Sequence, residues 1–402
     1  MSQFMSRQTI SSKRERISLN PQERKASVLL ALLFSTRMLG LFLLTPIFAV
    51  AAQSIPGGNN ATKVGIALGA YGLTQAIMQI PLGMASDKWG RRPVIMGGML
   101  LFVLGGVVSA LAQSVDGIIV GRVLQGLGAI SAAITAWVAD ATRPEVRTRA
   151  MAMVGSAIGL SFAVSLVLSP VLVGQFGLSG LFWAISLLGF VCLLLATFAI
   201  PEYPQAEPII RAKASDVLKQ GDLLRLNFGV FALHFILMML FVVIPGVLAQ
   251  LGQFDSGSLW KVYLPVIVLS FALMIPMVIY TEVRKAHRRV LQWLVLALAA
   301  IMALMPWASF SLWAMVVALF VFFVIFNTLE ALQPSMVSRV APAEYKGLAM
   351  GFYNTTQSLG VFGGGLTGGV IAATVGVHWA LWIGAALALL WWLTTRQFKT
   401  VL

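Results

Sequence analysis

The chain has 402 residues, of which 59% are hydrophobic and 10% are charged, and its mean hydropathy is +0.89. A soluble domain carries about a quarter charged residues, so this composition excludes a water-soluble protein and indicates an integral membrane protein. The formal net charge of +14 would suggest nucleic-acid binding in a soluble chain, but here its distribution among the loops decides its meaning.

The first apolar run follows a polar segment of 26 residues, and eleven further runs follow along the chain. Each is close to the length of about 20 residues that crosses a bilayer as a helix. The runs are continuous, whereas a membrane β-barrel needs alternating segments of about ten residues. The expected spans are 27–50, 64–85, 93–112, 115–139, 150–173, 178–200, 226–250, 260–281, 290–308, 310–336, 347–373 and 377–395.

The spans form two sets of six, and like residues recur between the sets: Arg37 corresponds to His234, and Ala152 to Ala349. Tandem six-span halves are a recurring transporter architecture, with the substrate site between them. The predicted fold class is an all-α membrane protein with twelve transmembrane helices in two pseudo-symmetric six-helix bundles. The expected domains are 1–26, a cytoplasmic N-terminal segment; 27–200, the N-terminal half; 201–225, a cytoplasmic linker; 226–395, the C-terminal half; and 396–402, a cytoplasmic tail.

Basic residues are concentrated in alternate connections between the spans. If both termini are cytoplasmic, 24 of the 28 Lys and Arg residues lie on the cytoplasmic side, only Lys63 and Lys261 lie outside, and Arg37 and Arg122 lie within spans. Loops rich in these residues stay in the cytoplasm. The positive charge is therefore a topology signal and leaves no nucleic-acid partner to be explained.

The most specific motif lies between the second and third spans and reads GMASDKWGRRP, from Gly83 to Pro93. It combines an acid, a glycine turn, a basic pair and a proline that can begin the next helix. The eleventh span begins on the same face, so its free amides could receive Asp87 and hold the halves closed. The alternative is that the basic residues only set topology. The predicted cytoplasmic gate comprises Gly83, Asp87, Gly90, Arg91 and Arg92, with Asp140 as the partner of Arg91.

This loop is similar to the signature G-x-x-x-D-x-x-G-R-[RK]-P of the major facilitator superfamily, and GRVLQGLGA in the fourth span resembles the motif of its twelve-helix drug-proton antiporter branch. FSTRMLG, YGLTQAIMQIPLG, LNFGVFALH, WKVY and YKGLAMG resemble the YajR-type inner-membrane transporters along essentially the whole chain. That group carries a soluble domain after the last span, which is not expected after Leu402. The fifth span reads Ser169-Pro170 and Val173-Gly174 where the antiporter motif has Gly-Pro and Gly-Gly, which weakens the implication of antiport.

Four ionisable residues lie inside spans, where a charge costs at least about 2.5–3.5 kcal/mol and usually has a role. They are Arg37, Arg122, His234 and Glu330. Glu330 is the only acid well inside a span and is the first candidate for proton coupling. His234 is the second, because histidine titrates near neutral pH. The alternative for all four is a static set of ion pairs or hydrogen bonds that joins helices.

Polar and aromatic side chains within the spans are candidates for the cavity lining, although helix packing or an interfacial aromatic belt explains any one of them as well. The candidates are Gln125, Tyr263, Tyr353, Asn354 and Gln357. The sequence has no Walker motif, metal-ligand cluster or nucleophile-base pair. We therefore expect neither an enzyme nor an ATP-driven pump, no metal, and no cofactor other than a proton gradient.

The predicted function is secondary active transport by alternating access, coupled to protons and directed to the export of small amphipathic or drug-like compounds. The protein is expected to act as a monomer in a bacterial inner membrane. One alternative is a symporter or facilitator of a specific metabolite. Another is a membrane sensor or scaffold that does not transport, in which Arg37, Glu330 and the signature loop could be neutralised without consequence.

Overall fold

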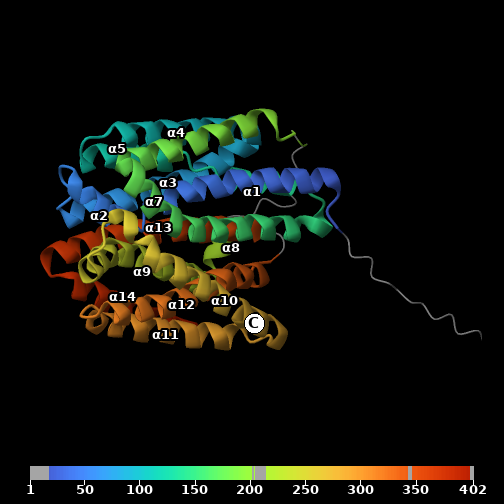
Figure 1. Ribbon diagram of the computed structural model, residues 1–402. Helices are drawn as coiled ribbons and strands as arrows, with labels where there is room; N and C mark the ends of the chain where they lie inside the picture. The colour runs from blue at the N-terminus through green and yellow to red at the C-terminus, as the bar shows by residue number, and fades with distance from the viewer. Residues whose placement is uncertain (1–17, 202, 204–213, 343–345, 399–402) are drawn as a thin grey trace, which may run out of the picture.

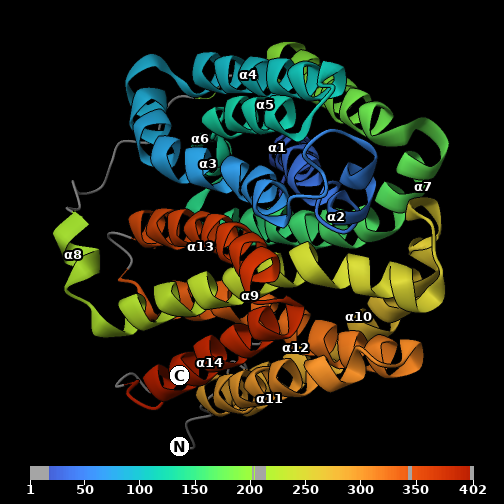
Figure 2. The ribbon, with the colours of Figure 1, turned by 90° about the vertical axis from the view of Figure 1, so that its left-hand side faces the viewer.

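A computed structural model describes residues 18–201, 203, 214–342 and 346–398, and this part of the chain is helical, with no strand. In Figure 1 the long helices run side by side in two layers, with α1 to α7 mostly above and α9 to α14 mostly below. Figure 2 views the same layers from one end, where α13 lies between the two sets. The first six spans and the last six therefore form separate bundles.

The N-terminal bundle begins with a helix whose start is encoded locally. The Asn20 side chain accepts a hydrogen bond from the Glu23 amide and the Glu23 carboxylate accepts one from the Asn20 amide, both at 2.8 Å, and Pro21 occupies the first turn. This reciprocal cap satisfies two amides that have no partner within the helix. The helices of this bundle are α1 (Pro21–Phe42), α2 (Phe48–Ala51), η1 (Ala52–Ser54), α3 (Ala61–Trp89), α4 (Arg91–Leu111), α5 (Val115–Leu127), α6 (Ser131–Asp140) and α7 (Pro144–Phe198).

The C-terminal bundle follows a short helix, α8 (Ala214–Leu218), which lies within the expected linker. Its first span begins at Gly221, five residues before the apolar run. The helices are α9 (Gly221–Gly252), η2 (Ser256–Ser258), α10 (Trp260–Arg284), α11 (His287–Ala308), α12 (Leu312–Val340), α13 (Lys346–Thr374) and α14 (Val377–Thr395).

Within the described residues, nine helical stretches are long and apolar enough to cross a membrane. One of them, α7, is 55 residues long and contains two spans, because Gly177 has φ 68° and turns the chain there. A positive φ is open to glycine at little cost. Two further helices, α3 and α13, have 29 residues each and carry more glycine and polar side chains. The predicted twelve-span, two-bundle fold is confirmed.

Two of the predicted spans, the first and the fourth, are interrupted in the structure. The first stops at Phe42 and resumes at Phe48 beyond Pro46, and the fourth is interrupted between Leu127 and Ser131. At the second break Gly128 packs on α4, where a Cβ would lie only 2.2 Å from the Gly98 carbonyl oxygen. Broken helices persist at membrane depth only where protein surrounds them, so these breaks depend on tertiary packing.

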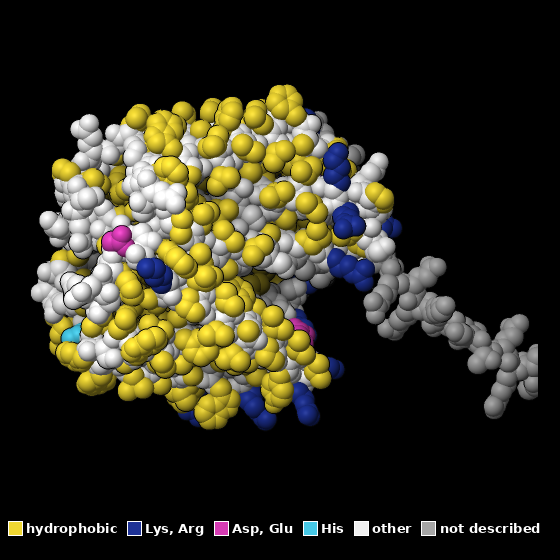
Figure 3. Space-filling model, in the orientation of Figure 1, with side chains coloured by type: hydrophobic (Ala, Val, Ile, Leu, Met, Phe, Trp, Pro, Cys, Tyr) yellow, Lys and Arg dark blue, Asp and Glu magenta, His cyan; other side chains and the backbone are white. Residues whose placement is uncertain are grey.

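The two ends of the molecule differ in charge. Lys and Arg gather at the end where α1 begins, on the right of Figure 3, while apolar side chains cover most of the visible flank. We call this the basic end; α1 and α13 begin there and α3 ends there. The opposite end, where α3 begins and α13 ends, is called the far end.

Candidate functional site

The central cluster of the C-terminal bundle joins three helices through His234 on α9, Glu330 on α12 and Gln357 on α13. The Gln357 amide nitrogen donates to His234 Nε2 at 2.6 Å and to Glu330 Oε1 at 3.4 Å. His234 Nδ1 lies 3.1 Å from the Val230 carbonyl oxygen. When Gln357 donates to Nε2, the ring proton sits on Nδ1, toward the Val230 carbonyl oxygen.

The acid and the imidazole of this cluster lie close together. Glu330 Oε2 lies 3.6 Å from His234 Nε2, and the Glu330 side chain is 30% exposed while that of His234 is 3% exposed. The carboxyl oxygen that faces the imidazole, Oε2, has no hydrogen-bond partner among the described residues.

Tyr353 and Asn354 lie beside this cluster on α13. Tyr353 is one helical turn before Gln357 and is 2% exposed, and its hydroxyl has no partner. Asn354 is partly exposed. The structure thus brings together four of the predicted residues of the C-terminal bundle around one acid.

An aromatic cluster lies on the far-end side of His234 and Glu330. Phe162 of the N-terminal bundle packs against Phe241, Phe323 and Phe326 of the C-terminal bundle, with ring centroids 5.7–6.5 Å apart. Phe326 precedes Glu330 by one turn and its ring lies 5.9 Å from that of His234. These rings lie between the acid and the far end.

In the N-terminal bundle two buried arginines lie around one tyrosine. The guanidinium carbons of Arg37 and Arg122 are 5.7 Å and 4.7 Å from the centroid of the Tyr71 ring. Arg37 donates to Ser131 at the start of α6. Arg122 donates to the Gly40 carbonyl at 3.1 Å and to Gln125 Oε1 at 3.0 Å.

Tyr263 lies apart from both clusters. Its hydroxyl donates to the Pro46 carbonyl at 3.2 Å, which ties α10 to the break after α1. It therefore braces the two bundles against each other near the far end.

The signature loop is organised by Arg91. Its guanidinium donates to Asp140 at 2.9 Å, to Ser86 at 2.9 Å and to Asp87. Asp140 is 3% exposed and Asp87 is 68% exposed. The expected Arg91–Asp140 ion pair is thus present, but Asp87 pairs within its own loop. Residues 343–345, which precede α13, lie outside the described residues.

Three other gate residues shape this loop. Arg92 donates to the Ile200 carbonyl and so ties the start of α4 to the end of α7. Gly90 has φ 95°, which favours glycine in the turn between α3 and α4. Gly83 packs on α6, where an added Cβ would lie 3.3 Å from the Ala132 methyl carbon.

The two bundles are in direct contact along α3 and α13 toward the far end. A Cβ added to Gly65 would lie 2.1 Å from the Gly365 carbonyl oxygen, and one added to Gly369 would lie 2.5 Å from the Ala61 carbonyl oxygen. Small residues let helices approach this closely in a membrane. The far end is therefore closed in this conformation.

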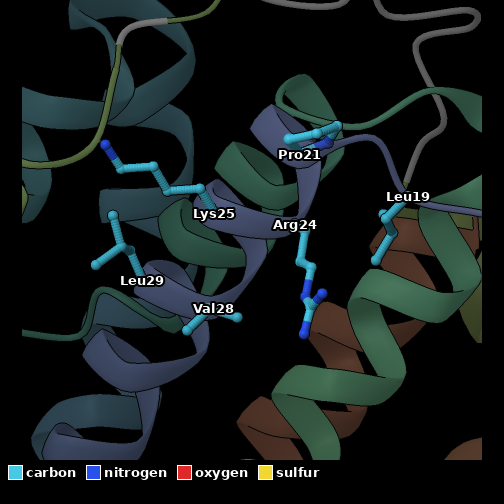
Figure 4. Close-up of a pocket in the computed structure, with 6 residues that line it drawn as sticks. All are labelled: Leu19, Pro21, Arg24, Lys25, Val28 and Leu29. Atoms are coloured by element: carbon cyan, nitrogen blue, oxygen red, sulfur yellow. The ribbon is translucent and has the colours of Figure 1, made fainter.

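A shallow pocket lies on the outer surface at the start of α1. It is lined by Leu19, Pro21, Arg24, Lys25, Val28 and Leu29. Figure 4 shows the Arg24 and Lys25 side chains extending away from each other, Lys25 to the upper left and Arg24 downward. The pocket contains none of the predicted site residues, and its two charges do not converge on one point. Elsewhere in the described chain, no group of three or more His, Cys, Asp or Glu side chains could hold a metal ion.

Sequence reasoning missed Tyr71, Gln75 and Gln79. They are buried at intervals of four residues along α3, so they share one face of that helix. The signal was present in YGLTQAIMQIP, where polar side chains recur at helical spacing inside an apolar run.

Comparison with known proteins agrees with this architecture. The family model described as Major Facilitator Superfamily matches residues 30–365 and 287–399. The chain is 41% identical over 387 residues to the inner membrane transport protein YajR of Escherichia coli (strain K12), covering 95% of this chain and 85% of that one. It is 28% identical over 358 residues to the multidrug resistance protein MdtH of Aeromonas salmonicida (strain A449), covering 86% and 88%.

A solved structure of a D-xylose-proton symporter superposes with a TM-score of 0.74 at 15% identity, covering 93% of this chain and 97% of that one. This likeness concerns the fold alone. The family is shown by the family model, which matches most of the chain, and by the 41% identity to the YajR transporter. The chain belongs to the major facilitator superfamily and is a multi-pass membrane transporter, not an enzyme.

Proposed function

We propose that the protein is a proton-coupled transporter that exports small amphipathic or drug-like compounds across a bacterial inner membrane. The observation that carries the proposal is the contact of Glu330, an acid inside a span, with His234 through Gln357. Ionisable groups at this depth commonly belong to proton relays. The kinship with a multidrug resistance protein supports the drug-like class of substrate.

The orientation that we propose puts the basic end in the cytoplasm, because loops rich in Lys and Arg stay there. The far end then faces outward and is closed where α3 meets α13. The recess between the bundles at the right-hand edge of Figure 3 opens to the cytoplasm. This conformation is the inward-open state of an alternating-access cycle in which one bundle rocks against the other.

A physical link joins the proton site to the closed end. Gln357 contacts both His234 and Glu330. The next residue of α13, Ser358, packs against α3, because a Cβ added to Gly72 would lie 2.7 Å from the Ser358 carbonyl oxygen. A proton on Glu330 or His234 changes which hydrogen bonds Gln357 can make. Protonation thus acts on the helix that closes the far end, which is what coupling requires.

The test measures proton-driven transport by the full chain in liposomes, with ethidium as the probe and an imposed pH gradient. Glu330→Gln keeps the size of the side chain and removes its titratable carboxyl group. Ethidium transport driven by the pH gradient should therefore fall to the level of protein-free liposomes. Glu282→Gln is the control, since Glu282 is an exposed acid paired with Arg339. Gradient-driven transport by the Glu330→Gln protein at the wild-type rate would remove Glu330 from the mechanism.

A symporter or facilitator of a specific metabolite remains the second candidate. The departure of Ser169-Pro170 from the antiporter pattern favours it, since Ser169 donates to the Leu43 carbonyl at the break in the first span instead of leaving a glycine contact. A deletion strain distinguishes export from uptake: an exporter predicts that the mutant accumulates more of the compound, and lower accumulation reverses the direction. We propose a monomer as the working unit.

A further inference from the structure

We propose that Arg37, Arg122 and Tyr71 form a binding site in the N-terminal bundle for the carboxylate of a small organic anion. The inference deepens the proposed transport function and rests on it, because it adds carboxylates to the drug-like compounds that the protein would transport. The two arginines come from α1 and α5, and both side chains are 0% exposed. They are among the largest fully buried side chains of the described chain.

Neither arginine has an acidic partner. No ion pair in the described part of the chain includes Arg37 or Arg122, and their hydrogen bonds go only to Ser131, Gly40 and Gln125. The Tyr71 ring offsets part of the charge through cation–π contact. Two buried guanidiniums without an anion nevertheless remain far from compensated, because a buried charge is stable only when it is paired and hydrogen-bonded.

The nitrogen atoms left without partners are the ones that a carboxylate would use. Nε and Nη2 of Arg37 and the same two atoms of Arg122 make no hydrogen bond. These atoms form one edge of the guanidinium, whose two parallel N–H groups can bind the two oxygens of a carboxylate. The Tyr71 hydroxyl and the Gln125 amide nitrogen are also buried without partners. The region thus holds an excess of donors from three helices.

A row of polar side chains leads from this site toward the basic end. Gln75 and Gln79 follow Tyr71 on the same face of α3, and Gln79 lies about 12 Å along the helix at 1.5 Å per residue. Gln75 Oε1 and both polar atoms of the Gln79 amide have no partner. Because α3 ends at the basic end and the far end is closed, an anion would approach along this row.

The competing explanation is purely structural, with the arginines bracing α1 against α5 and α6. A brace predicts that loss of either arginine lowers stability whatever is added. A binding site predicts a response that depends on the charge of the added compound. Thermal unfolding of the purified full chain in detergent separates the two, because a ligand of the native state raises its stability by mass action.

The probes are sodium benzoate and benzamide, which share a ring and differ in charge, with sodium chloride added to equal ionic strength. Wild type should unfold at a temperature that rises with benzoate and not with benzamide. Arg37→Gln and Arg122→Gln should each abolish the rise in unfolding temperature, and Arg122→Lys should keep a smaller rise. Arg339→Gln is the control, since Arg339 lies in an exposed ion pair, and it should keep the full rise. No benzoate response in wild type, an equal response to benzamide, or a response retained in both glutamine variants would overturn the proposal.

Two further variants keep the test decisive. If an arginine variant does not fold, Tyr71→Phe removes only the unpartnered hydroxyl and should weaken the apparent affinity for benzoate several-fold; an unchanged affinity counts against the site. The benzoate response should persist in Glu330→Gln, because it needs no proton gradient. Loss of proton-driven transport therefore bears on the coupling proposal, and loss of charge-dependent stabilisation bears on the anion site.

Discussion

Glu23 shows how one side chain can join distant parts of this fold. It caps α1 through Asn20 and also accepts hydrogen bonds from the Arg143 backbone amide at 3.1 Å and from the Arg143 guanidinium at 2.8 and 3.1 Å. The carboxylate raises the pKa of the Arg143 guanidinium, first through the hydrogen bond and then through its charge. The start of α1 is thus tied to the loop that precedes α7.

Glu23→Gln should therefore lower stability. The substitution removes the charge that pairs with Arg143, and the new amide nitrogen cannot accept a hydrogen bond as the carboxylate oxygen does. For a largely buried group this lowers the free energy of unfolding by about 1–3 kcal/mol. Asp116→Asn is the matched control, because Asp116 is 61% exposed in its pair with Lys63, and exposed pairs contribute about 0–1 kcal/mol. Thermal unfolding in detergent compares the two variants; equal losses would show that the Glu23 contact is no stronger than a surface pair.

At the level of elements, the contact of α3 with α13 depends on glycines that leave the backbones free to touch. Gly65, Gly365 and Gly369 lie in this contact, and added methyl groups would meet backbone atoms at 2.1–2.7 Å. A backbone atom cannot move aside as the end of a flexible side chain can. Closure of the far end is therefore sensitive to one added side chain.

Gly65→Val should hold the far end open and lower transport sharply, while Gly97→Val, at a position on α4 with no atom within 4 Å of the added Cβ, should not. The readout is the rate at which a thiol reagent labels Val361→Cys, a buried position on the α13 face that meets α3. The native Cys192 is 3% exposed and gives a low background. Equal labelling in both glycine variants would show that this contact does not close the far end.

For the whole molecule, we propose that the signature loop controls the balance between inward-open and outward-open states. Asp87 is exposed and bonded to Arg91 in this conformation, while Arg91 stays anchored on buried Asp140. When the basic end closes, the start of α13 approaches this loop and Asp87 can exchange its partner for helix amides. The acid then stabilises the closed state more than the open one.

Asp87→Asn should therefore shift the population toward the inward-open state. A cysteine introduced at Asn354, which is partly exposed on α13 and three residues before Gln357, should be labelled faster in this variant than in the parent Asn354→Cys protein. Asp116→Asn, at the far end, is the control and should leave the rate unchanged. A labelling rate that does not respond to Asp87→Asn would reduce the loop to a topology signal.

Residues that are close in sequence, or that carry a recognisable spacing, were the ones predicted best. The Arg91–Asp140 pair followed from the motif and from the shared face of the two helix ends. The helix breaks after Phe42 and Leu127 did not, because hydropathy is continuous through them and the cause at Gly128 is the backbone of α4. The row from Tyr71 to Gln79 was visible as a pattern, but its meaning depends on Arg37 and Arg122, which come from other helices.

The sequence by itself determined that this chain spans a membrane twelve times, that its positive charge belongs to one face, and that Glu330 is the acid to examine. These conclusions rest on hydropathy and charge, which act segment by segment and need no knowledge of neighbours. Only the tertiary structure decided that the far end is closed, that Gln357 joins His234 to Glu330, and that two arginines share Tyr71 without an acid. Those contacts join residues from different helices, and helix–helix packing, which sequence patterns specify only weakly, sets them.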